Sequence, residues 1–378
     1  MSSTASDLGQ LGVNLLWLRP GEVGGTETYA RRVLAALAAD SPDLSIHLFG
    51  TAPGIEAVTP ANATVTAHTA ASTALPPTRR LFVERTWLPG AVKAAGLDVL
   101  HHLGGTVPIN PDVASLVTIH DLQPLDHPDN FSSTKIRFLQ RAIPAAIERA
   151  GAVATPSEWV REEVISRFDL NADEVLAVSA FADPVDLATP AQPSALISHI
   201  VSQGPTLLYP AMTLNHKNHR LLFDAFADAV RRDPELQLVC VGSPGRDDAE
   251  IRAHADSVSA RIHMLGYVSK ADLDSLYRSA DALVFPSRYE GFGLPILEAQ
   301  NYGLPVICSN VTAMPEVAGD GARLIDPLNP GQWADAMTER FTPVDRARLV
   351  AAGFENARRY SIEATAAQQK RAYAQVGA

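Results

Sequence analysis

Residues 282–299 of the chain read ALVFPSRYEGFGLPILEA, and this stretch decides which fold to expect. Its apolar start, 282–285, predicts a buried strand, and the glycines Gly291 and Gly293 predict a sharp loop behind it. Pro295 fits the first turn of a following helix, where its missing N–H is harmless. Because strand, glycine loop and helix in this order form the unit of a parallel α/β sheet, we expect such a sheet around the stretch.

The same alternation of short apolar runs with helix-period segments extends over the rest of the chain. It predicts helices that begin near Thr26 and that cover 158–168 and 343–376. Further strands are expected at 11–18, 45–49, 99–101, 115–120, 152–155, 206–209, 237–241, 262–264, 306–309 and 323–325.

These strands fall into two series, separated by the proline-containing segment 183–205, which predicts a connection between domains. We therefore expect two doubly wound, Rossmann-like α/β domains that face a central cleft, a number that suits a chain of 378 residues. The first domain takes residues 1–185 and the second 186–355. A C-terminal helix over 356–378 is expected to cross back onto the first domain.

Composition and charge exclude several classes of protein. The formal net charge of -11 argues against a general nucleic-acid binder and against electrostatic docking on anionic lipid. The first apolar run, 13–18, is too short for a signal-peptide core or a membrane span, so no stable membrane insertion is expected. The two cysteines, Cys240 and Cys308, sit in apolar runs and predict buried thiols in a cytoplasmic protein without disulfides.

The loop within 282–299 has the composition of an anion site. Its glycines leave backbone N–H groups uncovered at a helix N-terminus, where free donors and the helix dipole favour phosphate. Two carboxylates bracket this loop, Glu290 before it and Glu298 in the first helical turns. A carboxylate there can stabilise the helix, or it can accept two hydrogen bonds from a ribose diol.

Glu290 and Glu298, with seven residues between them, resemble the Glu-x7-Glu signature of the GT-B glycosyltransferases, specifically the retaining family 4. The resemblance covers nearly the whole chain and is most marked for bacterial mannosyltransferases. The other motifs that carry it are Gly24-Gly25-x-Glu27, Thr118-Ile-His120-Asp121, Thr155-Pro-Ser-Glu-Trp, His216-Lys217-Asn218, Leu265-Gly-Tyr-Val268, Gly303-x-Pro-Val and Pro315-Glu316-Val.

The resemblance implies a role for each matching position. Glu298 would hold the ribose hydroxyls, Glu290 would contact the donor sugar, and Lys217 would neutralise the diphosphate. His120 would lie beside the donor sugar near the reacting carbon, so that His120, Glu290 and Lys217 form the catalytic set. The remaining donor contacts would come from Gly24 and Gly25 on the diphosphate, Tyr267 and Val268 on the base, and Gly291, Phe292, Gly293 and Leu294 on phosphate or sugar oxygens.

The acceptor side is less determined. His102 and Asp121 are candidates because each follows or ends a strand at the carboxyl edge, where open α/β sheets bind ligands. For His102 a packing role is as plausible as a place in the acceptor cleft, and a histidine such as His120 can also serve only to hydrogen-bond a loop. The implied partners are a nucleotide-sugar donor and a saccharide acceptor, and the oligomeric state is left open.

Retention in this family is explained by front-face substitution, in which the departing phosphate takes the acceptor's proton. No cofactor and no metal is expected, since Lys217 and the helix dipoles stabilise the leaving diphosphate. The literal Asp-x-Asp at Asp272 and Asp274 lies in a helix-period segment, and we interpret it as a solvated helix face. Glu290 as a covalent nucleophile is the less favoured alternative.

One departure from the family pattern concerns the phosphate site. Many relatives carry an Arg five residues before the phosphate Lys, whereas this chain has Met212 there. Arg161, Arg220 and Arg288 are candidates to supply the missing charge.

The first choice of reaction is transfer of mannose from GDP-mannose. UDP-glucose, UDP-N-acetylglucosamine and ADP-glucose are alternative donors. A nucleotide-sugar epimerase or hydrolase, and a catalytically silent nucleotide-sugar-binding protein, are alternative functions on the same fold. A NAD-dependent oxidoreductase is disfavoured because Ile296 stands where Gly-x-Gly-x-x-Gly needs its third glycine.

Overall fold

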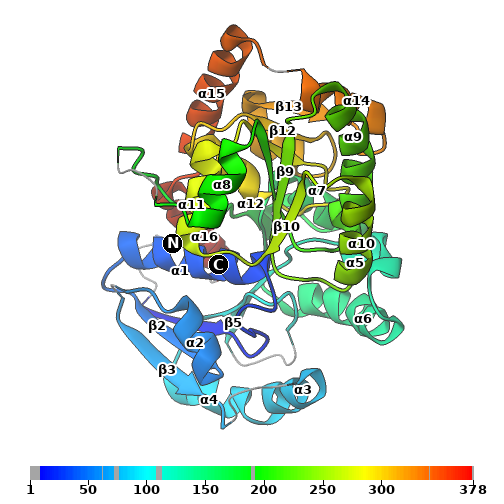
Figure 1. Cartoon of the computed structure of the whole chain (residues 1–378). Helices are drawn as coiled ribbons and strands as arrows, with labels where there is room; N and C mark the ends of the chain where they lie inside the picture. Colours follow the sequence, from blue (N-terminus) through cyan, green and yellow to red (C-terminus); the bar gives the residue numbers. More distant parts are fainter. Residues whose placement is uncertain are drawn as a thin grey trace. The chain divides into compact units, whose positions relative to one another are not determined.

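The computed structural model describes residues 9–61, 63–71, 76–107, 113–188, 192–339 and 341–376 (Figure 1). The chain contacts divide it into two compact units. Unit 1 comprises residues 1–181 together with 360–378, and unit 2 comprises residues 182–359. The C-terminal helix therefore belongs to unit 1.

Unit 1 is built on a seven-stranded parallel sheet in the order β3-β2-β1-β4-β5-β6-β7. Two of these strands, β3 and β7, were not predicted. They form the two edges of the sheet. β3 is mostly polar and leaves no apolar run, whereas β7 is a three-residue strand within the short apolar run 175–178. The strands are β1 Gln10–Asn14, β2 Ser45–Gly50, β3 Val65–Thr69, β4 Val99–His102, β5 Ala114–Thr118, β6 Ala152–Thr155 and β7 Val175–Ala177.

The strand predicted over 11–18 is shorter in the structure, because β1 ends at Asn14. The Asn14 side chain accepts a hydrogen bond from the Leu16 amide, and the Leu18 amide bonds to the Leu15 carbonyl, which turns the chain away from the sheet. Residues 15–18 are nevertheless buried, so their apolar character reflects burial rather than strand.

The helix predicted over 158–168 has these bounds in the structure, and the one predicted near Thr26 begins at Gly25. Thr51, Ser132 and Ser157 cap their helices through side-chain oxygens that accept backbone N–H groups. The helices are α1 Gly25–Asp40, α2 Ala52–Val58, α3 Pro77–Thr86, α4 Leu88–Ala95, α5 Gln123–Asp126, α6 Ser133–Arg149, α7 Glu158–Phe168 and α16 Ile362–Val376, with 3-10 turns η1 Pro128–Asn130 and η2 Ala172–Glu174.

The helix predicted over 343–376 is broken into α15 Pro343–Arg358 and α16. The break has a local cause: the Ser361 side chain accepts the Ala364 amide and so caps a new helix. Helix α16 packs on α1 and against β5 and β6. The Tyr373 hydroxyl lies 3.0 Å from Nδ1 of His101, and Nε2 of His101 lies 2.7 Å from Oγ1 of Thr118, which ties α16 to the buried strands β4 and β5.

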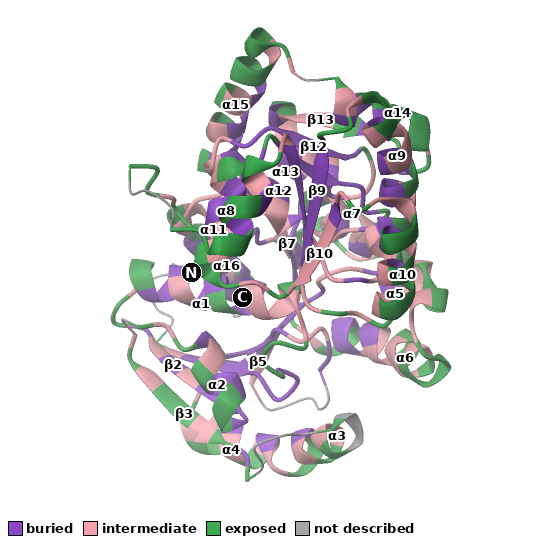
Figure 2. Ribbon diagram, in the orientation of Figure 1, coloured by how far each residue is buried: buried purple, intermediate pink, exposed green. Residues whose placement is uncertain are grey.

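Unit 2 is built on a six-stranded parallel sheet in the order β10-β9-β8-β11-β12-β13. All six strands lie where the sequence predicted them, to within two residues. The four inner strands β8, β9, β11 and β12 are buried on both faces, as Figure 2 shows for β9 and β12, and such burial favours continuous apolar runs. The six strands are β8 Thr206–Pro210, β9 Gln237–Val241, β10 Ile262–Gly266, β11 Ala282–Phe285, β12 Val306–Ser309 and β13 Ala322–Ile325.

Helices cover both faces of this sheet (Figure 1). On one face α9 packs against α10 and α14, and on the other α8 packs against α11 and α12 against α15. The helices of unit 2 are α8 Ala195–Ser202, α9 His219–Arg232, α10 Asp248–Val258, α11 Lys270–Ser279, α12 Leu294–Asn301, α13 Met314–Ala318, α14 Pro330–Thr338 and α15, with 3-10 turns η3 Asn215–Lys217 and η4 Gly319–Gly321.

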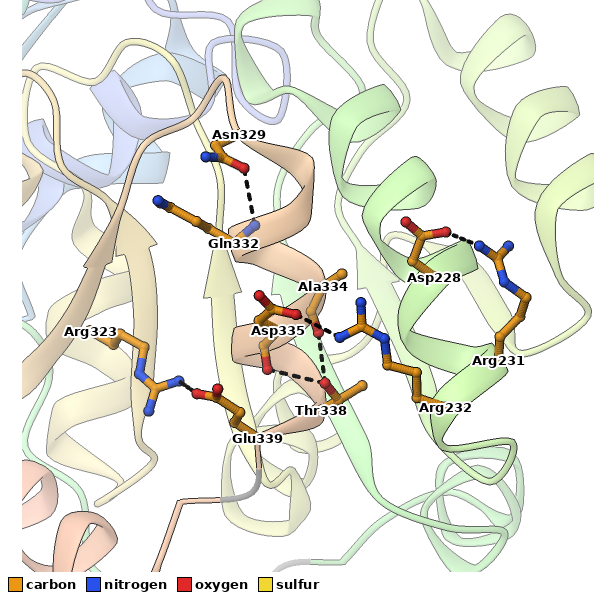
Figure 3. A network of polar contacts seen from close by, with 10 residues as sticks. All are labelled: Asp228, Arg231, Arg232, Arg323, Asn329, Gln332, Ala334, Asp335, Thr338 and Glu339. Atoms are coloured by element: carbon orange, nitrogen blue, oxygen red, sulfur yellow. Dashed lines mark hydrogen bonds and ion pairs between the residues drawn. The ribbon is translucent and has the colours of Figure 1, made fainter.

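The contact between α9 and α14 combines a buried apolar layer with an exposed polar rim. Trp333 and Phe226 are fully buried. Above them Arg232 donates to Asp335 at 2.6 Å, and Asn329 caps α14 by accepting the Gln332 amide (Figure 3). Both side chains of the Arg232–Asp335 pair are about half exposed, so the apolar layer holds this contact.

None of the helices in the described part of the chain is long and apolar enough to cross a membrane. Cys240 and Cys308 are free and buried in β9 and β12, as predicted.

Three buried histidines stay uncharged in the folded protein. Burial lowers the pKa of His102 to about 3 and holds the pKa of His101 well below its usual range. Burial, with the charge of Lys217, also lowers the pKa of His219 to about 3. These rings are therefore neutral imidazoles over the physiological pH range.

We predict that Tyr373→Phe lowers the free energy of unfolding of unit 1 by about 1–3 kcal/mol, because Nδ1 of His101 then lies buried without its partner. Urea unfolding monitored by circular dichroism checks this. The control is Tyr267→Phe, which changes an 82% exposed tyrosine and should alter stability little. Equal stability of the two variants would show that the His101 contact contributes nothing.

We predict that stability falls on acidification below about pH 6.5, the ordinary pKa of histidine. Below that pH the histidines of the unfolded chain bind protons, whereas the buried rings of the folded chain stay neutral down to their lowered pKa values. Each buried ring therefore lowers the free energy of unfolding by up to about 1.4 kcal/mol per pH unit. Urea titrations at pH 7.5, 6.5, 5.5 and 5.0 measure the slope. His219→Leu should flatten it, the exposed His199→Gln should not, and a pH-independent stability would contradict the prediction.

Candidate functional site

The site in unit 2 begins where β8 and β11 pair in parallel. The chain runs outward from β8 to β9 and β10 and then returns to β11 on the other side of β8. The carboxyl ends of β8 and β11 thus flank a topological switch point, the usual place for a ligand in an open α/β sheet. Two loops leave from here: 211–218 after β8 and 286–293 after β11.

Lys217 and Glu290, one from each loop, meet in an ion pair. The Lys217 ammonium lies 2.6 Å from a Glu290 carboxylate oxygen, and the two side chains are only 17% and 12% exposed. The ammonium also lies 5.6 Å above the ring of Phe285, the last residue of β11. The backbone is fixed as well, since the buried Tyr209 hydroxyl donates to the Lys217 carbonyl.

Neighbouring contacts hold the two loops together. Asn218 adopts a left-handed conformation with φ 64°, and its side-chain amide donates to the carbonyls of Pro286 and Pro327 at 3.1 and 2.8 Å. The Arg288 amide donates to the His216 carbonyl at 2.8 Å. The Lys217–Glu290 pair is therefore prepositioned by backbone contacts on both sides of it.

The glycine loop leads into α12 as predicted. Gly293 is the N-cap residue with φ 100°, a conformation that favours glycine, and no side chain caps the helix. The amide end of α12 is therefore left without a capping side chain beside Leu294, while Gly291 and Phe292 form the preceding loop. Such an end favours an anion.

Glu298 lies one turn into α12 and is fixed by a residue from α11. The Tyr277 hydroxyl donates to Oε2 of Glu298 at 2.9 Å, and the Tyr277 ring is buried and stacks on Tyr302 at 5.0 Å. This leaves the Glu298 carboxylate in a set orientation. Tyr267 and Val268 follow β10, with Tyr267 82% exposed and Val268 partly buried.

Unit 1 has a matching switch point between β1 and β4. His120 lies just beyond β5 at this carboxyl edge. Its Nε2 lies 2.7 Å from the Leu103 carbonyl and must donate to it, and its ring meets Tyr29 edge-on at 5.0 Å. Burial lowers the pKa of His120 to about 4, so the ring is neutral and Nδ1 is its hydrogen-bond acceptor.

The acceptor-side candidates lie at the same edge but in different environments. His102 ends β4 and is buried, with Nδ1 at 3.2 Å from the Asn14 amide and no partner for Nε2 among the described residues. Asp121 is partly buried and accepts the Gln123 amide at 3.0 Å. His102 therefore has a clear packing contact, and its free nitrogen leaves the binding role open.

Gly24 and Gly25 form the start of α1. Gly24 is the N-cap residue with φ 60°, and no side chain caps this helix either. Glu27 stabilises the loop before them, because its carboxylate accepts the Gly21 amide at 2.8 Å.

Asp272 and Asp274 are engaged in contacts of their own. The Asp272 carboxylate accepts the Ser194 amide, and the Asp272 amide donates to the Ser269 side chain that caps α11. Asp274 bonds to Arg278 at 2.8 Å and to the Tyr302 hydroxyl at 2.5 Å. They lie on α11, as the helix-face interpretation predicted. In the part of the chain that the structure describes, no group of three or more His, Cys, Asp or Glu side chains has a metal-binding arrangement.

Sequence reasoning missed three residues that position the site. Tyr277 orients Glu298, Asn218 joins the two loops, and the Thr312 hydroxyl accepts the Glu290 amide at 3.2 Å. Asn218 could have been found, since it directly follows Lys217. Tyr277 and Thr312 lie 13 residues before and 22 residues after Glu290, a separation that no local pattern reveals.

Two family models match the chain, one in each half. Residues 23–184 match the model described as Glycosyltransferase Family 4, and residues 197–343 match the model described as Glycosyl transferases group 1. Together they cover most of the chain.

The chain is 32% identical over 222 residues to the O-antigen chain mannosyltransferase B of Escherichia coli, which covers 56% of this chain and 57% of the relative. It is 27% identical over 244 residues to the D-inositol 3-phosphate glycosyltransferase of Corynebacterium efficiens, which covers 61% and 57%. The matches thus span less than two thirds of these curated relatives.

Among solved structures, HepE of Anabaena in complex with UDP and glucose is similar, with a TM-score of 0.70 at 18% identity over 96% of this chain and 98% of that chain. That likeness concerns the fold. With two consecutive family models, the two parallel sheets and the Glu290–Glu298 signature, the chain belongs to the family 4, group 1 glycosyltransferases with the GT-B fold.

Proposed function

We propose that the protein is a retaining glycosyltransferase that moves a hexose from a nucleotide sugar onto a saccharide acceptor. The observation that carries the proposal is the Lys217–Glu290 pair, held at a switch point next to the uncapped N-terminus of α12. A cation, a helix N-terminus and two fixed carboxylates suit a nucleoside diphosphate linked to a sugar, which carries phosphates and two sets of hydroxyls.

In this proposal the bound donor separates Lys217 from Glu290, and each residue contacts a different part of the donor. The diphosphate takes the Lys217 ammonium and the N-terminus of α12, and the Glu290 carboxylate then accepts hydrogen bonds from sugar hydroxyls. Glu298, held by Tyr277, accepts the ribose hydroxyls. Gly24 and Gly25 contact the diphosphate, and Tyr267 and Val268 contact the base.

The chemical step is a front-face substitution. The bond between the anomeric carbon and the phosphate oxygen breaks, the acceptor oxygen bonds to that carbon on the same face, and the acceptor proton passes to the departing phosphate. His120 is neutral, so its Nδ1 accepts a hydrogen bond from a donor hydroxyl rather than adding positive charge. His102 and Asp121 are the candidates for acceptor contacts.

The developing charge falls on the leaving diphosphate, and the chain's own groups are suited to stabilise it. A fixed cation and helix dipoles act without reorganisation in a partly buried site. We therefore propose that the chemistry requires neither a metal nor another cofactor, and we place the reaction in the cytoplasm.

GDP-mannose is the proposed donor. It is supported by the similarity to a mannosyltransferase that builds O-antigen chains. UDP-glucose, UDP-N-acetylglucosamine and ADP-glucose are the alternatives, and the relative named as an inositol-phosphate glycosyltransferase shows how acceptors differ among proteins similar to this one.

We predict that one nucleoside diphosphate among GDP, UDP and ADP stabilises the protein without metal. At about one hundred times its dissociation constant the gain is about 2.7 kcal/mol, a clear rise in the melting temperature. Glu298→Gln should lower the affinity at least tenfold, because it weakens the ribose contact, and the exposed Asp256→Asn is the matched control. Stabilisation by GDP alone supports GDP-mannose as the donor. Stabilisation by UDP or ADP alone points to a donor with that nucleotide instead, and no stabilisation by any of the three contradicts the proposal.

We predict that turnover of GDP-mannose with oligosaccharide acceptors continues in EDTA. Lys217→Met should lower kcat about 10²–10³-fold, as loss of one group that stabilises a leaving anion does, while the fold remains intact by circular dichroism. Labelled product is measured with and without acceptor. Sugar release that needs no acceptor would favour the hydrolase, and formation of an isomerised nucleotide sugar would favour the epimerase. Nucleotide binding without any turnover would favour the silent binding protein.

A further inference from the structure

A cavity of about 390 Å³ opens in unit 2 at the start of α9. It adjoins the loop that carries Lys217, since Asn215 and Asn218 line it, yet neither Lys217, Glu290 nor Glu298 is among its lining residues. The cavity is therefore separate from the side chains assigned above to the donor.

Arginines outnumber acidic residues in the lining of this cavity. The lining includes Arg220, Arg246 and Arg288 on the one hand and Asp247 and Glu250 on the other. Among the described residues, Arg288 has no carboxylate partner, and its guanidinium contacts only the Asn215 side chain at 3.3 Å.

The other two arginines are paired weakly. Arg246 lies 3.4 Å from the carboxylate of the adjacent Asp247, with the arginine half exposed. Arg220 pairs with Glu250, and both of these side chains are more than half exposed. Exposed pairs of this kind contribute little, so an anion in the cavity can compete for both arginines.

The backbone adds to the positive potential. Helix α9 has 14 residues and points its N-terminus at the cavity through His219 and Arg220. No side chain caps this end, because the amide of the N-cap residue Asn218 bonds to two carbonyls elsewhere. The first N–H groups of a helix have no acceptor within it and favour an anion.

A buried polar side chain lacks a partner at the same place. His219 is 2% exposed and lines the cavity, and neither of its ring nitrogens has a hydrogen-bond partner among the residues that the structure describes. Buried polar groups are normally satisfied, and those without a partner are often completed by a ligand or ion. This observation is independent of the arginines and of the helix end.

We propose that this cavity is an anion site for a phosphate or diphosphate group, bound by Arg246, Arg288 and the N-terminus of α9. The group has two possible sources. It is the diphosphate of the donor, in which case Arg288 supplies the charge missing at Met212, or it belongs to a second phosphorylated compound. The first source rests on the proposed function, whereas the anion site itself does not.

The three candidates for the missing charge differ in the structure. Arg161 lies in unit 1 and donates to the carbonyls of Val175 and Ala172, both at 2.6 Å, and Arg220 has an ion pair. Arg288 has neither, and it is two residues from Glu290 with its amide bonded to His216 next to Lys217. The structure thus favours Arg288.

The test is calorimetric titration of the full chain with inorganic pyrophosphate in metal-free buffer. Arg288→Gln and Arg246→Gln should each weaken binding about tenfold, as loss of a charged hydrogen bond does. Arg231→Gln is the matched control: it removes the same charge from the other end of α9, where Arg231 pairs with Asp228 (Figure 3), and should leave binding unchanged. Circular dichroism confirms that each variant is folded.

The result that overturns the proposal is absence of pyrophosphate binding, or binding that Lys217→Met abolishes while Arg246→Gln and Arg288→Gln leave it unchanged. A second titration, with GDP and UDP, separates the sources. If nucleotide displaces pyrophosphate and Arg288→Gln weakens nucleotide binding too, the anion is the donor's diphosphate. If both bind together, the cavity serves a second phosphorylated ligand. Neither titration needs turnover, so an inactive protein that binds pyrophosphate contradicts only the proposed function.

Discussion

Strands β8 and β11 pair in parallel, with Leu207 opposite Ala282, although 74 residues lie between these two in the chain. Parallel pairing forces both strands to end at the same edge of the sheet. The loop that carries Lys217 and the loop that carries Glu290 therefore leave side by side, and the 2.6 Å ion pair follows from this. The carbonyl contacts of Asn218 and the bond from the Arg288 amide to His216 then fix the two loops to each other.

The ion pair also balances the charge of the site. A largely buried ammonium without a counter-charge would be unfavourable, and the Glu290 carboxylate supplies that counter-charge. In the proposed function the diphosphate of the donor takes the place of Glu290 on Lys217. Binding then exchanges one set of charge-assisted hydrogen bonds for another. In unit 1, by contrast, His101 and His102 are buried as neutral rings. His101 bonds to Thr118 and Tyr373, and Nδ1 of His102 lies 3.2 Å from the Asn14 amide.

The basic cavity at the start of α9 lies on the same loops and so depends on the same pairing. Loop 211–218 contributes Asn215 and Asn218, and loop 286–293 contributes Arg288. A single pair of adjacent strands therefore positions both Glu290, which suits hydroxyl groups, and Arg288, which suits phosphate. The family pattern places the second cation at position 212, and we propose that Arg288 supplies it from the neighbouring loop.

Local sequence determined much of this protein. Apolar runs predicted the strands of unit 2, and four of them need continuous apolar residues because they are buried on both faces. The glycine before Leu294 predicted the uncapped end of α12. The family signature named Glu290, Glu298 and Lys217. Only the tertiary structure decided the edge strands β3 and β7, the end of β1 at Asn14, the Tyr277–Glu298 bond and the gathering of three arginines and His219 at one cavity. The edge strand β3 is mostly polar and leaves no apolar run. The other contacts join residues that are far apart in the chain and that the order of the strands in the sheet brings together.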